Sequence, residues 1–408
     1  MKEPKIRFKG FQGEWEEAPF SEIANRTSAS ASSSLFPGVE FEDINSGEGT
    51  LNKDVRKKNI IKIGKQFSNG DVLFGKLRPY LKNILLAKFT GVAIGDFWVL
   101  HPQKVTSELL YILLNSREFM RIANISSGSK MPRADWNLVS STSFAYPEAK
   151  EEQCKLGSYF QHLDSLIQST TKKIESLKQV KAASLQSMFP QEGETTPRVR
   201  FKGFEGEWEE TPFSETFDYL KNNSLSRAEL SDGGVVMNIH YGDVLIKYGE
   251  CVDVGKEVKT FVKEEHVAKR LHQSCAITNG DIIFADAAED NTVGKCSEII
   301  AKEDDAIISG LHTIPCRPMK QFATRYLGYY LNSNAYHNQL LPHIQGTKIS
   351  SISKKAISQT HINSPLDIAE QRAIASYFTT LDRQITLQSQ RLEKLKQIKA
   401  ACLDNMFV

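Results

Sequence analysis

The sequence lacks long apolar runs and an excess of charge of either sign. No run of about 18 apolar residues occurs in the 408 residues, so we expect no membrane-spanning helix. The opening segment, MKEPKIRFKGF, has no apolar stretch of the kind that a secretory signal needs, and we expect a cytoplasmic protein. Lysine and arginine number 51 and aspartate and glutamate 49, a net charge of +2. This balance argues against binding by overall charge, but it is compatible with local basic patches that contact DNA.

Paired cysteines and catalytic motifs are also missing. The six cysteines form no C-x-x-C pair and have no histidine cluster near them, so we expect reduced thiols and no metal site. There is no G-x-x-x-x-G-K-[ST] phosphate loop, no strand-linked G-x-G-x-x-G and no G-x-S-x-G or H-E-x-x-H motif. Glu257 and Lys259 have the E-x-K spacing of a metal-dependent nuclease, but the preceding Pro-Asp is absent. We therefore expect no catalysis and no cofactor in this chain.

An internal repeat organises the chain. The segments RFKGFQGEWEEAPFS, from Arg7, and RFKGFEGEWEETPFS, from Arg200, differ at two of fifteen positions and lie 193 residues apart. The segments KQVKAASLQSMF, from Lys178, and KQIKAACLDNMF, from Lys396, lie 218 residues apart. The second half therefore carries about 25 extra residues, most of them before residue 279.

The interiors of the two halves match only in short motifs. Asn-Gly-Asp begins a strand-like segment at Asn69 and again at Asn279, and Leu-Asn-Ser occurs at Leu114 and Leu331. Near-identical ends around dissimilar interiors suit one scaffold that presents two different recognition surfaces. The alternative is a duplication whose interiors drifted without such a purpose.

Two segments, 152–188 and 370–407, are predicted to be long helices. Their apolar residues follow the 3-4-3-4-3 spacing of a coiled-coil seam, at Phe160, Leu163, Ile167, Ile174 and Leu177 and at Phe378, Leu381, Ile385, Leu392 and Leu395. Thr170 and Gln388 interrupt the two seams at equivalent positions. A single apolar stripe must be buried, and the other copy is the obvious partner. The alternative is that each helix packs only on its own domain.

The remaining segments indicate a mixed α/β fold with two globular domains. Strand-like residues fill VAIGDFWVLHP and CSEIIAKEDDAIISGLHTIPCRP, whereas Ser107–Arg121 and Phe322–His337 have helical spacing. We divide the chain into a first domain, a helix, a second domain and a second helix, at 1–150, 151–190, 191–363 and 364–408.

Basic residues near aromatic ones are the candidate contacts to DNA, because arginine and lysine pair with phosphates and guanine edges. They occur in loops of both halves, at Lys76, Arg78, Tyr80, Lys82, Lys130, Arg133, Lys348, Lys354 and Lys355. Residues 1–150 have a net charge of +5 and residues 191–363 a net charge of −5. The acidic stretch Asp286–Asp290 aligns with the loop of Lys76 and Arg78, so contact positions do not transfer simply between the halves. An ordinary solvated surface is the alternative for each cluster.

The chain resembles the specificity subunit of Type I restriction-modification systems. The resemblance rests on the duplicated RFKGF-x-GEWEE openings, the NGD-[VI]-[LI]-F strands and the two P-x₄-EQ…YF-x₂-LD…LKQ-[VI]-KAA…MF helices, and it covers the whole chain. It implies two target-recognition domains, each reading one half of a bipartite site on double-stranded DNA. It also implies that the two helices pair as an antiparallel coiled coil, in a pseudo-twofold repeat, and set the spacing between the half-sites.

The resemblance also implies partners. Two modification subunits would carry S-adenosylmethionine, and two restriction subunits would add ATP- and Mg-dependent translocation and cleavage. Helix pairing and docking would use the seam residues above together with Tyr159 and Tyr377. Three other interpretations stay open: a self-contained methyltransferase-nuclease, a coiled-coil protein scaffold without DNA contact, and a specificity subunit for a Type II-like fused partner.

Overall fold

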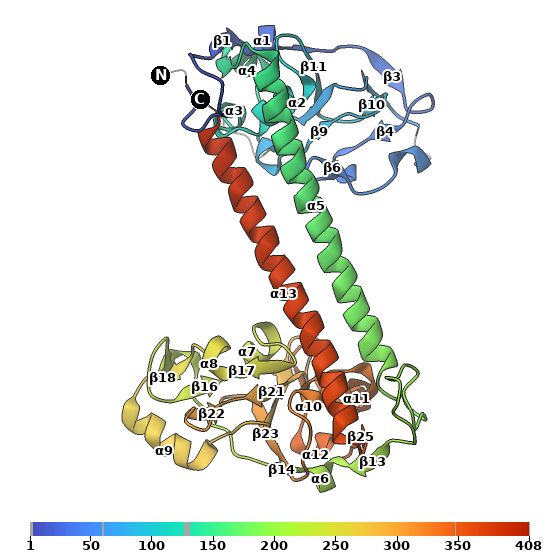
Figure 1. The fold of residues 1–408 in the computed structure, drawn as a ribbon, viewed down its shortest axis with the longest axis vertical. Helices are drawn as coiled ribbons and strands as arrows, with labels where there is room; N and C mark the ends of the chain where they lie inside the picture. Colours follow the sequence, from blue (N-terminus) through green and yellow to red (C-terminus); the bar gives the residue numbers. More distant parts are fainter. Residues whose placement is uncertain (1–2, 59–60, 126–130, 347, 408) are drawn as a thin grey trace. The chain divides into compact units, whose positions relative to one another are not determined.

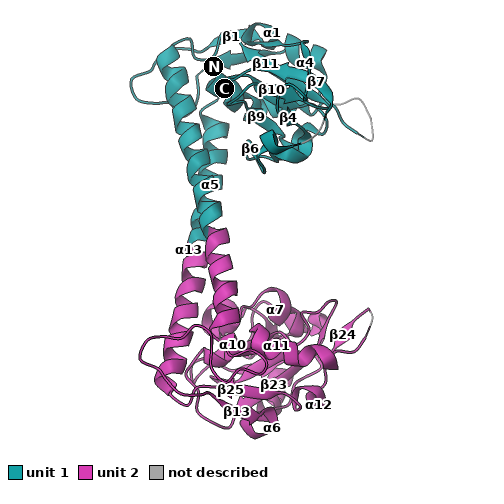
Figure 2. Cartoon of the chain, turned by 90° about the vertical axis from the view of Figure 1, so that its right-hand side faces the viewer, with its two compact units in different colours: residues 1–173, 388–408 teal, residues 174–387 magenta. Residues whose placement is uncertain are grey.

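The chain forms two compact units. The computed structural model describes residues 3–58, 61–125, 131–346 and 348–407. Unit 1 comprises residues 1–173 and 388–408, and unit 2 comprises residues 174–387 (Figure 2). Two long helices, α5 (Lys150–Ser187) and α13 (Ile368–Asn405), each contribute to both units (Figure 1). Their bounds lie within two residues of the predicted ones. No helix in the described part of the chain is long and apolar enough to span a membrane.

Unit 1 contains two four-stranded sheets and short helices. One sheet has the order β3-β7-β10-β4 and the other β2-β11-β8-β9, while β1 pairs with β12 and β5 with β6. The strands are β1 (Glu16–Pro19), β2 (Ala24–Arg26), β3 (Ser30–Ser32), β4 (Gly38–Val39), β5 (Ile44–Asn45), β6 (Thr50–Leu51), β7 (Ile63–Phe67), β8 (Val72–Gly75), β9 (Ile84–Leu86), β10 (Gly91–Ala93), β11 (Phe97–Pro102) and β12 (Ser143–Tyr146). The helices are α1 (Phe20–Ile23), α2 (Ser107–Asn115), α3 (Arg117–Ala123) and α4 (Trp136–Ser141).

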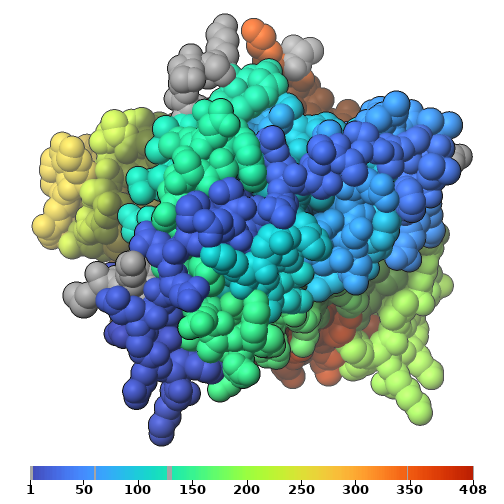
Figure 3. All heavy atoms as spheres, turned by 90° about the horizontal axis from the view of Figure 1, so that it is seen from above, coloured from blue at the N-terminus to red at the C-terminus, as the bar shows by residue number. Residues whose placement is uncertain are grey.

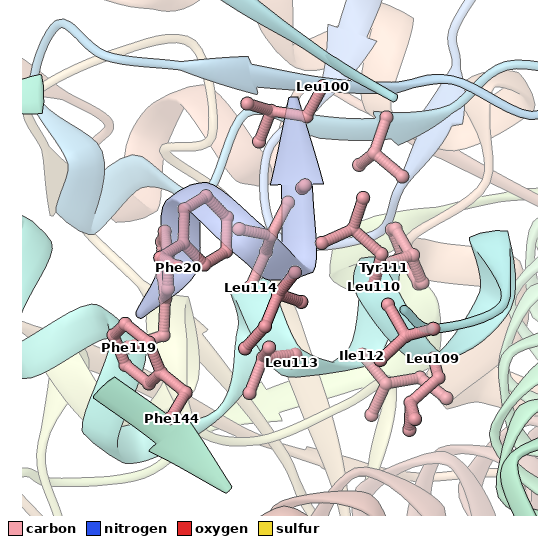
Figure 4. Packing of buried hydrophobic residues seen from close by; sticks show 14 of the residues in the cluster. Phe20, Leu100, Leu109, Leu110, Tyr111, Ile112, Leu113, Leu114, Phe119 and Phe144 are labelled. Atoms are coloured by element: carbon pink, nitrogen blue, oxygen red, sulfur yellow. The ribbon is translucent and has the colours of Figure 1, made fainter. Parts of the chain in front are cut away.

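The core of unit 1 lies between the β2-β11-β8-β9 sheet and the helices (Figure 4). Three fully buried rings, Phe20, Phe119 and Phe144, come from three different elements. Their ring centroids lie 5.3 to 5.8 Å apart, the spacing of edge-on and tilted aromatic pairs. The aliphatic residues of α2 fill the space beside them, because its apolar positions recur at helical spacing.

Unit 2 repeats this plan with additions. Its main sheet has the order β14-β23-β19-β21-β17, a second has β15-β18-β16-β22, and β13 pairs with β25 and β20 with β24. The strands are β13 (Glu209–Pro212), β14 (Phe217–Tyr219), β15 (Leu230–Ser231), β16 (Met237–Ile239), β17 (Cys251–Asp253), β18 (Phe261–Val262), β19 (Ile282–Ala285), β20 (Ala287–Ala288), β21 (Cys296–Ile300), β22 (Ile307–Ser309), β23 (Thr313–Pro318), β24 (Ser350–Ser351) and β25 (His361–Ser364). The helices are α6 (Phe213–Thr216), α7 (Tyr241–Ile246), α8 (Val254–Glu257), α9 (Glu265–Cys275), α10 (Tyr326–Leu331), α11 (Asn334–Leu340) and α12 (Lys354–Ile357).

The extra residues of the second half lie before β19, as the sequence offsets predict. There β17 adds a fifth strand to the main sheet, and α7, α8 and α9 precede β19. The Asn-Gly-Asp motifs form the turns that lead into β8 and β19. Their glycines, Gly70 and Gly280, have φ values of 92° and 87°, a region that a side chain disfavours.

Each of the two predicted mid-domain helices is in fact two helices. The first breaks at Ser116, between α2 and α3, and the second at Ser333, between α10 and α11. Both serines have extended backbone angles, and the Ser116 hydroxyl accepts a hydrogen bond from the amide of Phe119 at 3.2 Å. Helical spacing of apolar residues does not reveal such a break, but the repeated Leu-Asn-Ser motif marks it, because serine favours the position before a helix.

The repeated opening motif docks onto the start of the long helix. The Arg7 guanidinium donates to Glu152 of α5 at 2.7 and 2.8 Å and to the Gly13 carbonyl. In unit 2, Arg200 donates to Glu370 of α13 at the same two distances. Both glutamates are almost fully buried, so each depends on its arginine for a charged partner. In Figure 3, the dark blue N-terminal segment lies beside the green start of α5.

The glutamine that follows each glutamate fastens the helix start to the domain. Gln153 donates to the Pro147 carbonyl at 2.8 Å and accepts from the amide of Thr106. Gln371 makes the same two bonds, to Pro365 and from Ala323. The conserved-looking Glu-Gln pairs of the two halves are therefore structural.

The two long helices pair antiparallel within each unit. In unit 1, Lys399 of α13 pairs with Asp164 of α5 at 2.6 Å. In unit 2, Lys181 of α5 pairs with Asp382 of α13, also at 2.6 Å. These are equivalent pairs, because both lysines and both aspartates are 218 residues apart. The prediction that the copies pair with each other is confirmed.

The end of each helix completes the core of the unit in which it finishes. Met188 and Phe189, after α5, are buried in unit 2, where Phe189 stacks on Phe378 with 5.9 Å between ring centroids. Met406 and Phe407, after α13, pack into unit 1, where Phe407 contacts Trp15 and Phe160. Each unit therefore combines residues of both repeats.

Replacing Arg7 with alanine should lower the free energy of unfolding by about 3 kcal/mol, since it leaves the Glu152 carboxylate buried without a partner. Arg200→Ala should cost a similar amount through Glu370. Urea denaturation of the full chain measures both. Arg198→Ala is the control, because its side chain is 62% exposed and its ion pair with Glu194 should contribute no more than about 1 kcal/mol. Equal losses for Arg7→Ala and Arg198→Ala would contradict this role.

Candidate nucleic-acid interface

Two basic loops predicted separately from the sequence lie together in unit 1. The loop after β8 contains Lys76 and Arg78, and the loop before α4 contains Arg133. Backbone hydrogen bonds join them, from Arg78 to the Pro132 carbonyl at 2.8 Å and from Ala134 to the Lys76 carbonyl at 2.9 Å. A β-bridge between Leu77 and Arg133 fixes their register. The two loops therefore form one basic edge of the domain.

A single carboxylate holds two of these basic side chains. Asp96 accepts from Arg133 at 3.1 Å and lies 3.3 Å from the Lys76 ammonium. Burial raises the pKa of Asp96, but the hydrogen bonds from Arg133 and Lys76 outweigh it, so that its pKa lies below the ordinary value. All three side chains are about one-third to one-half exposed, so solvent can compete for the pair.

The other predicted contacts of this edge are in different surroundings. The side chains of Arg78 and Tyr80 are exposed and face solvent. Lys82 is half-buried and lines a cavity beside the helix pair instead of the basic edge. Lys130 lies outside the described residues. Arg78 and Lys82 both have left-handed backbone angles, with φ of 50° and 51°, where the short turn Pro79–Leu81 begins and ends.

The predicted basic residues of unit 2 are exposed but not gathered in the same way. Lys348 precedes β24, and Lys354 and Lys355 begin α12. The Lys354 ammonium lies 5.4 Å from the centre of the Tyr219 ring and donates to the Leu220 carbonyl at 3.3 Å. Lys355 and Lys348 carry the exposed positive charge of this region.

The sequence analysis missed a dense basic segment at the outer edge of unit 1. Six basic residues lie between residues 53 and 65, a density visible in the sequence. Lys53, Lys58 and Lys62 pair with acidic groups, mainly Glu40 and Asp43. The exposed side chains of Arg56 and Lys57 keep their charge available at the surface.

The predicted pairing and docking residues fall into two groups. Those buried in the helix seam or in a domain core are Phe160, Leu163, Ile167, Ile174, Phe378 and Leu381, and those half-buried along it are Leu177, Ile385, Leu392 and Leu395. Tyr159 and Tyr377 instead lie at the rim, each with its ring edge-on to a phenylalanine of the repeated opening, Phe8 or Phe201. Only this rim group has side-chain surface suited to a partner.

The E-x-K residues do not form a nuclease site. The Glu257 carboxylate accepts from the amide of Asp253 at 2.8 Å, and Lys259 donates to the Gly255 carbonyl at 3.5 Å. Both contacts are local to α8. Among the residues that the structure describes, no three His, Cys, Asp or Glu side chains gather as metal ligands.

Comparisons with known proteins agree on one family. A family model for the Type I restriction modification DNA specificity domain matches residues 205–397. The specificity subunit of the Type I restriction enzyme MjaVIII of Methanocaldococcus jannaschii is 21% identical over 300 residues, covering 71% of this chain and 67% of that protein.

Solved structures extend the similarity in fold over both units. The S subunit of a Type I restriction-modification system from M. genitalium has a TM-score of 0.60 at 13% identity, covering 100% of this chain and 99% of that one. A chain from structural work on complex assembly and conformational transition in the type I R-M system has a TM-score of 0.55 at 19% identity, covering 95% and 96%.

Replacing Asp96 with asparagine should strengthen DNA binding, because it releases Lys76 and Arg133 for phosphates. We expect the plot of log affinity against log salt to steepen by up to about one unit for each cation that gains a phosphate. Binding of the full chain to duplex DNA over a salt series measures this. Glu118→Gln, elsewhere in unit 1, removes the same charge and should have no such effect. Identical salt slopes for the two variants would place the basic edge away from DNA.

Proposed function

Since this chain belongs to the specificity subunits of Type I restriction-modification systems, we propose that its two domains each read one half of a bipartite DNA site. The observation that carries this proposal is one repeated frame around two different interiors. The Arg-Glu pairs, the Lys-Asp pairs and the exchanged helix ends recur in both units. The sheets and loops between them differ in strand number and charge. An asymmetric, two-part DNA sequence calls for such a molecule.

Charge supports different modes of contact in the two domains. The first domain has an excess of positive charge and an edge formed by Lys76, Arg78 and Arg133, which suits phosphate and guanine contacts. The second domain has a negative excess, so its exposed Lys348 and Lys355 would contact phosphates at few positions. We infer that it depends more on neutral hydrogen-bonding side chains to read bases.

The matching rims of the helix pair are the proposed docking surfaces for two modification subunits. Phe8 with Tyr159, and Phe201 with Tyr377, present equivalent half-buried aromatic pairs in the two units. Two copies of one partner fit two copies of one surface. S-adenosylmethionine, ATP and Mg would be bound by the modification and restriction subunits, and this chain would supply sequence recognition without catalysis.

Exchange of one domain tests the proposal. Replacing residues 22–146 with the corresponding region of a relative should change one half of the methylated sequence, since the frame stays intact. The measurement is genome-wide mapping of methylated adenines after co-expression with the modification subunit. Replacing residues 215–363 is the matched control and should change the other half only. A simultaneous change of both halves in either variant would overturn the two-module proposal.

Lengthening both helices tests their role as a spacer. Four helix-forming residues inserted near Thr170 and four near Gln388 lie between the Lys-Asp pairs, so both pairs keep their partners. The insertion adds about 6 Å of helix. DNA rises about 3.4 Å per base pair, so the gap between half-sites should grow by one or two base pairs with the half-sites unchanged.

Insertion in α5 alone is the control for the spacer experiment. It gives the paired helices unequal lengths, so at least one set of interhelical contacts must shift, and methylation should fall. An active double-insertion variant with the original gap would show that the helices do not set the spacing.

A further inference from the structure

A cavity in unit 1 lies where the domain meets the helix pair. Its volume is about 290 Å³, and its lining includes Lys82 from the domain and Lys396 and Lys399 from α13. Glu48 and Asp164 also line it, so the lining has three cations and two carboxylates. One of the carboxylates, Asp164, is already paired with Lys399 at 2.6 Å.

Lys82 is the unusual member of this group. Its ammonium makes no hydrogen bond or ion pair with any residue that the structure describes. Burial, and secondarily the nearby charge of Lys399, lower the pKa of Lys82. Its left-handed backbone is held by hydrogen bonds from its amide to Pro79 and to its carbonyl from Gly47. Such a backbone costs about 1 kcal/mol or more in a residue other than glycine, so the surroundings hold the lysine there.

The equivalent place in unit 2 shows what is missing. Lys181 is the counterpart of Lys399, and it pairs both with Asp382 and with Glu250, at 2.6 and 2.7 Å. Glu250 is a residue of the domain, so this second ion pair joins the domain to the helix pair. No domain carboxylate among the described residues of unit 1 pairs with Lys399 in the same way.

The domain lysines of the two units also correspond. Ile84 pairs with Phe74 in unit 1, and Cys296 pairs with Phe284 at the equivalent position in unit 2. Lys82 precedes Ile84 by two residues, and Lys295 precedes Cys296 by one. The Lys295 ammonium donates to the carbonyls of Leu245 and Tyr248, and the charge of Glu250 acts on it as well. Unit 2 thus surrounds a carboxylate with two lysines, whereas unit 1 has the lysines and a cavity.

We propose that this cavity binds a phosphate oxyanion, which bridges Lys82 and Lys399 as the Glu250 carboxylate does in unit 2. A bound oxyanion would join the first domain to the helix pair by the same electrostatic link. The phosphate could come from solution or from the DNA backbone, and both sources supply the same chemistry. The proposal does not depend on how the chain reads DNA sequence.

Calorimetric titration of the full chain with inorganic phosphate tests the site, with chloride at equal ionic strength as the reference. We expect one phosphate per chain. Lys82→Ala should weaken binding about tenfold or more, because a charge-assisted contact is lost. Lys57→Ala, which removes an exposed cation elsewhere in unit 1, should bind as the parent does. Absence of phosphate binding by the parent, or unchanged binding by Lys82→Ala, overturns the proposal.

The reciprocal change in unit 2 provides a second measurement. Glu250→Ala removes the carboxylate beside Lys181 and Lys295, and should raise the stoichiometry from one phosphate to two. In unit 1, Lys82→Glu supplies a carboxylate to Lys399 and should abolish phosphate binding, with a rise in the phosphate-free thermal midpoint over Lys82→Ala. A Glu250→Ala variant that still binds one phosphate would contradict the equivalence of the two places.

Duplex DNA distinguishes the sources of the oxyanion. If a backbone phosphate enters the cavity, Lys82→Ala should lower DNA affinity and reduce the salt slope by about one, and free phosphate should compete with DNA. If the oxyanion comes from solution, Lys82→Ala should lose phosphate binding and keep the parent's DNA affinity and salt slope. Both results support the site, and loss of neither interaction rejects it.

Discussion

The exchange of helix ends between the two repeats is the constraint on which the rest of the structure depends. Phe189 follows the helix of the first repeat and is fully buried in unit 2. Phe407 follows the helix of the second repeat and packs in unit 1 against Trp15. Neither domain core is complete with its own repeat alone. Antiparallel pairing is therefore required by the cores, and the seam between the helices only has to be compatible with it.

This constraint explains where the two halves of the sequence match. The buried Arg-Glu pairs, the helix-fastening glutamines and the final Met-Phe residues all contribute to the same joint, which occurs twice. A change in one copy of the joint cannot be compensated by the other. The sheets and loops away from it have no such requirement, so strands, helices and charges were free to diverge there.

Much of the frame is predictable from the sequence, because local spacing determines it. Heptad spacing locates both long helices to within two residues, and Asn-Gly-Asp locates the turns before β8 and β19. The breaks at Ser116 and Ser333 are not predictable from apolar spacing, since the helices on either side pack into one core. Spacing also indicates that each helix needs a partner, but the direction of pairing came from the family resemblance.

The candidate site was less predictable, because its electrostatics depend on contacts between distant residues. Lys76 and Arg133 looked like two free basic clusters, yet both contact Asp96. Lys82 belonged to the same basic run as Arg78, but a left-handed turn directs it towards the helix pair. Neither the shared carboxylate nor the turn has a signature in the sequence.

The exchanged helix ends also affect the order in which the molecule can fold on the ribosome. Residues 174–387 form unit 2 and are continuous in sequence, whereas unit 1 needs residues 388–408 as well. Domains generally fold in the order of their synthesis, from the N-terminus onwards. Here the first domain to emerge must wait for the last segment, because Met406 and Phe407 fill its core. Vectorial synthesis therefore completes unit 2 before unit 1.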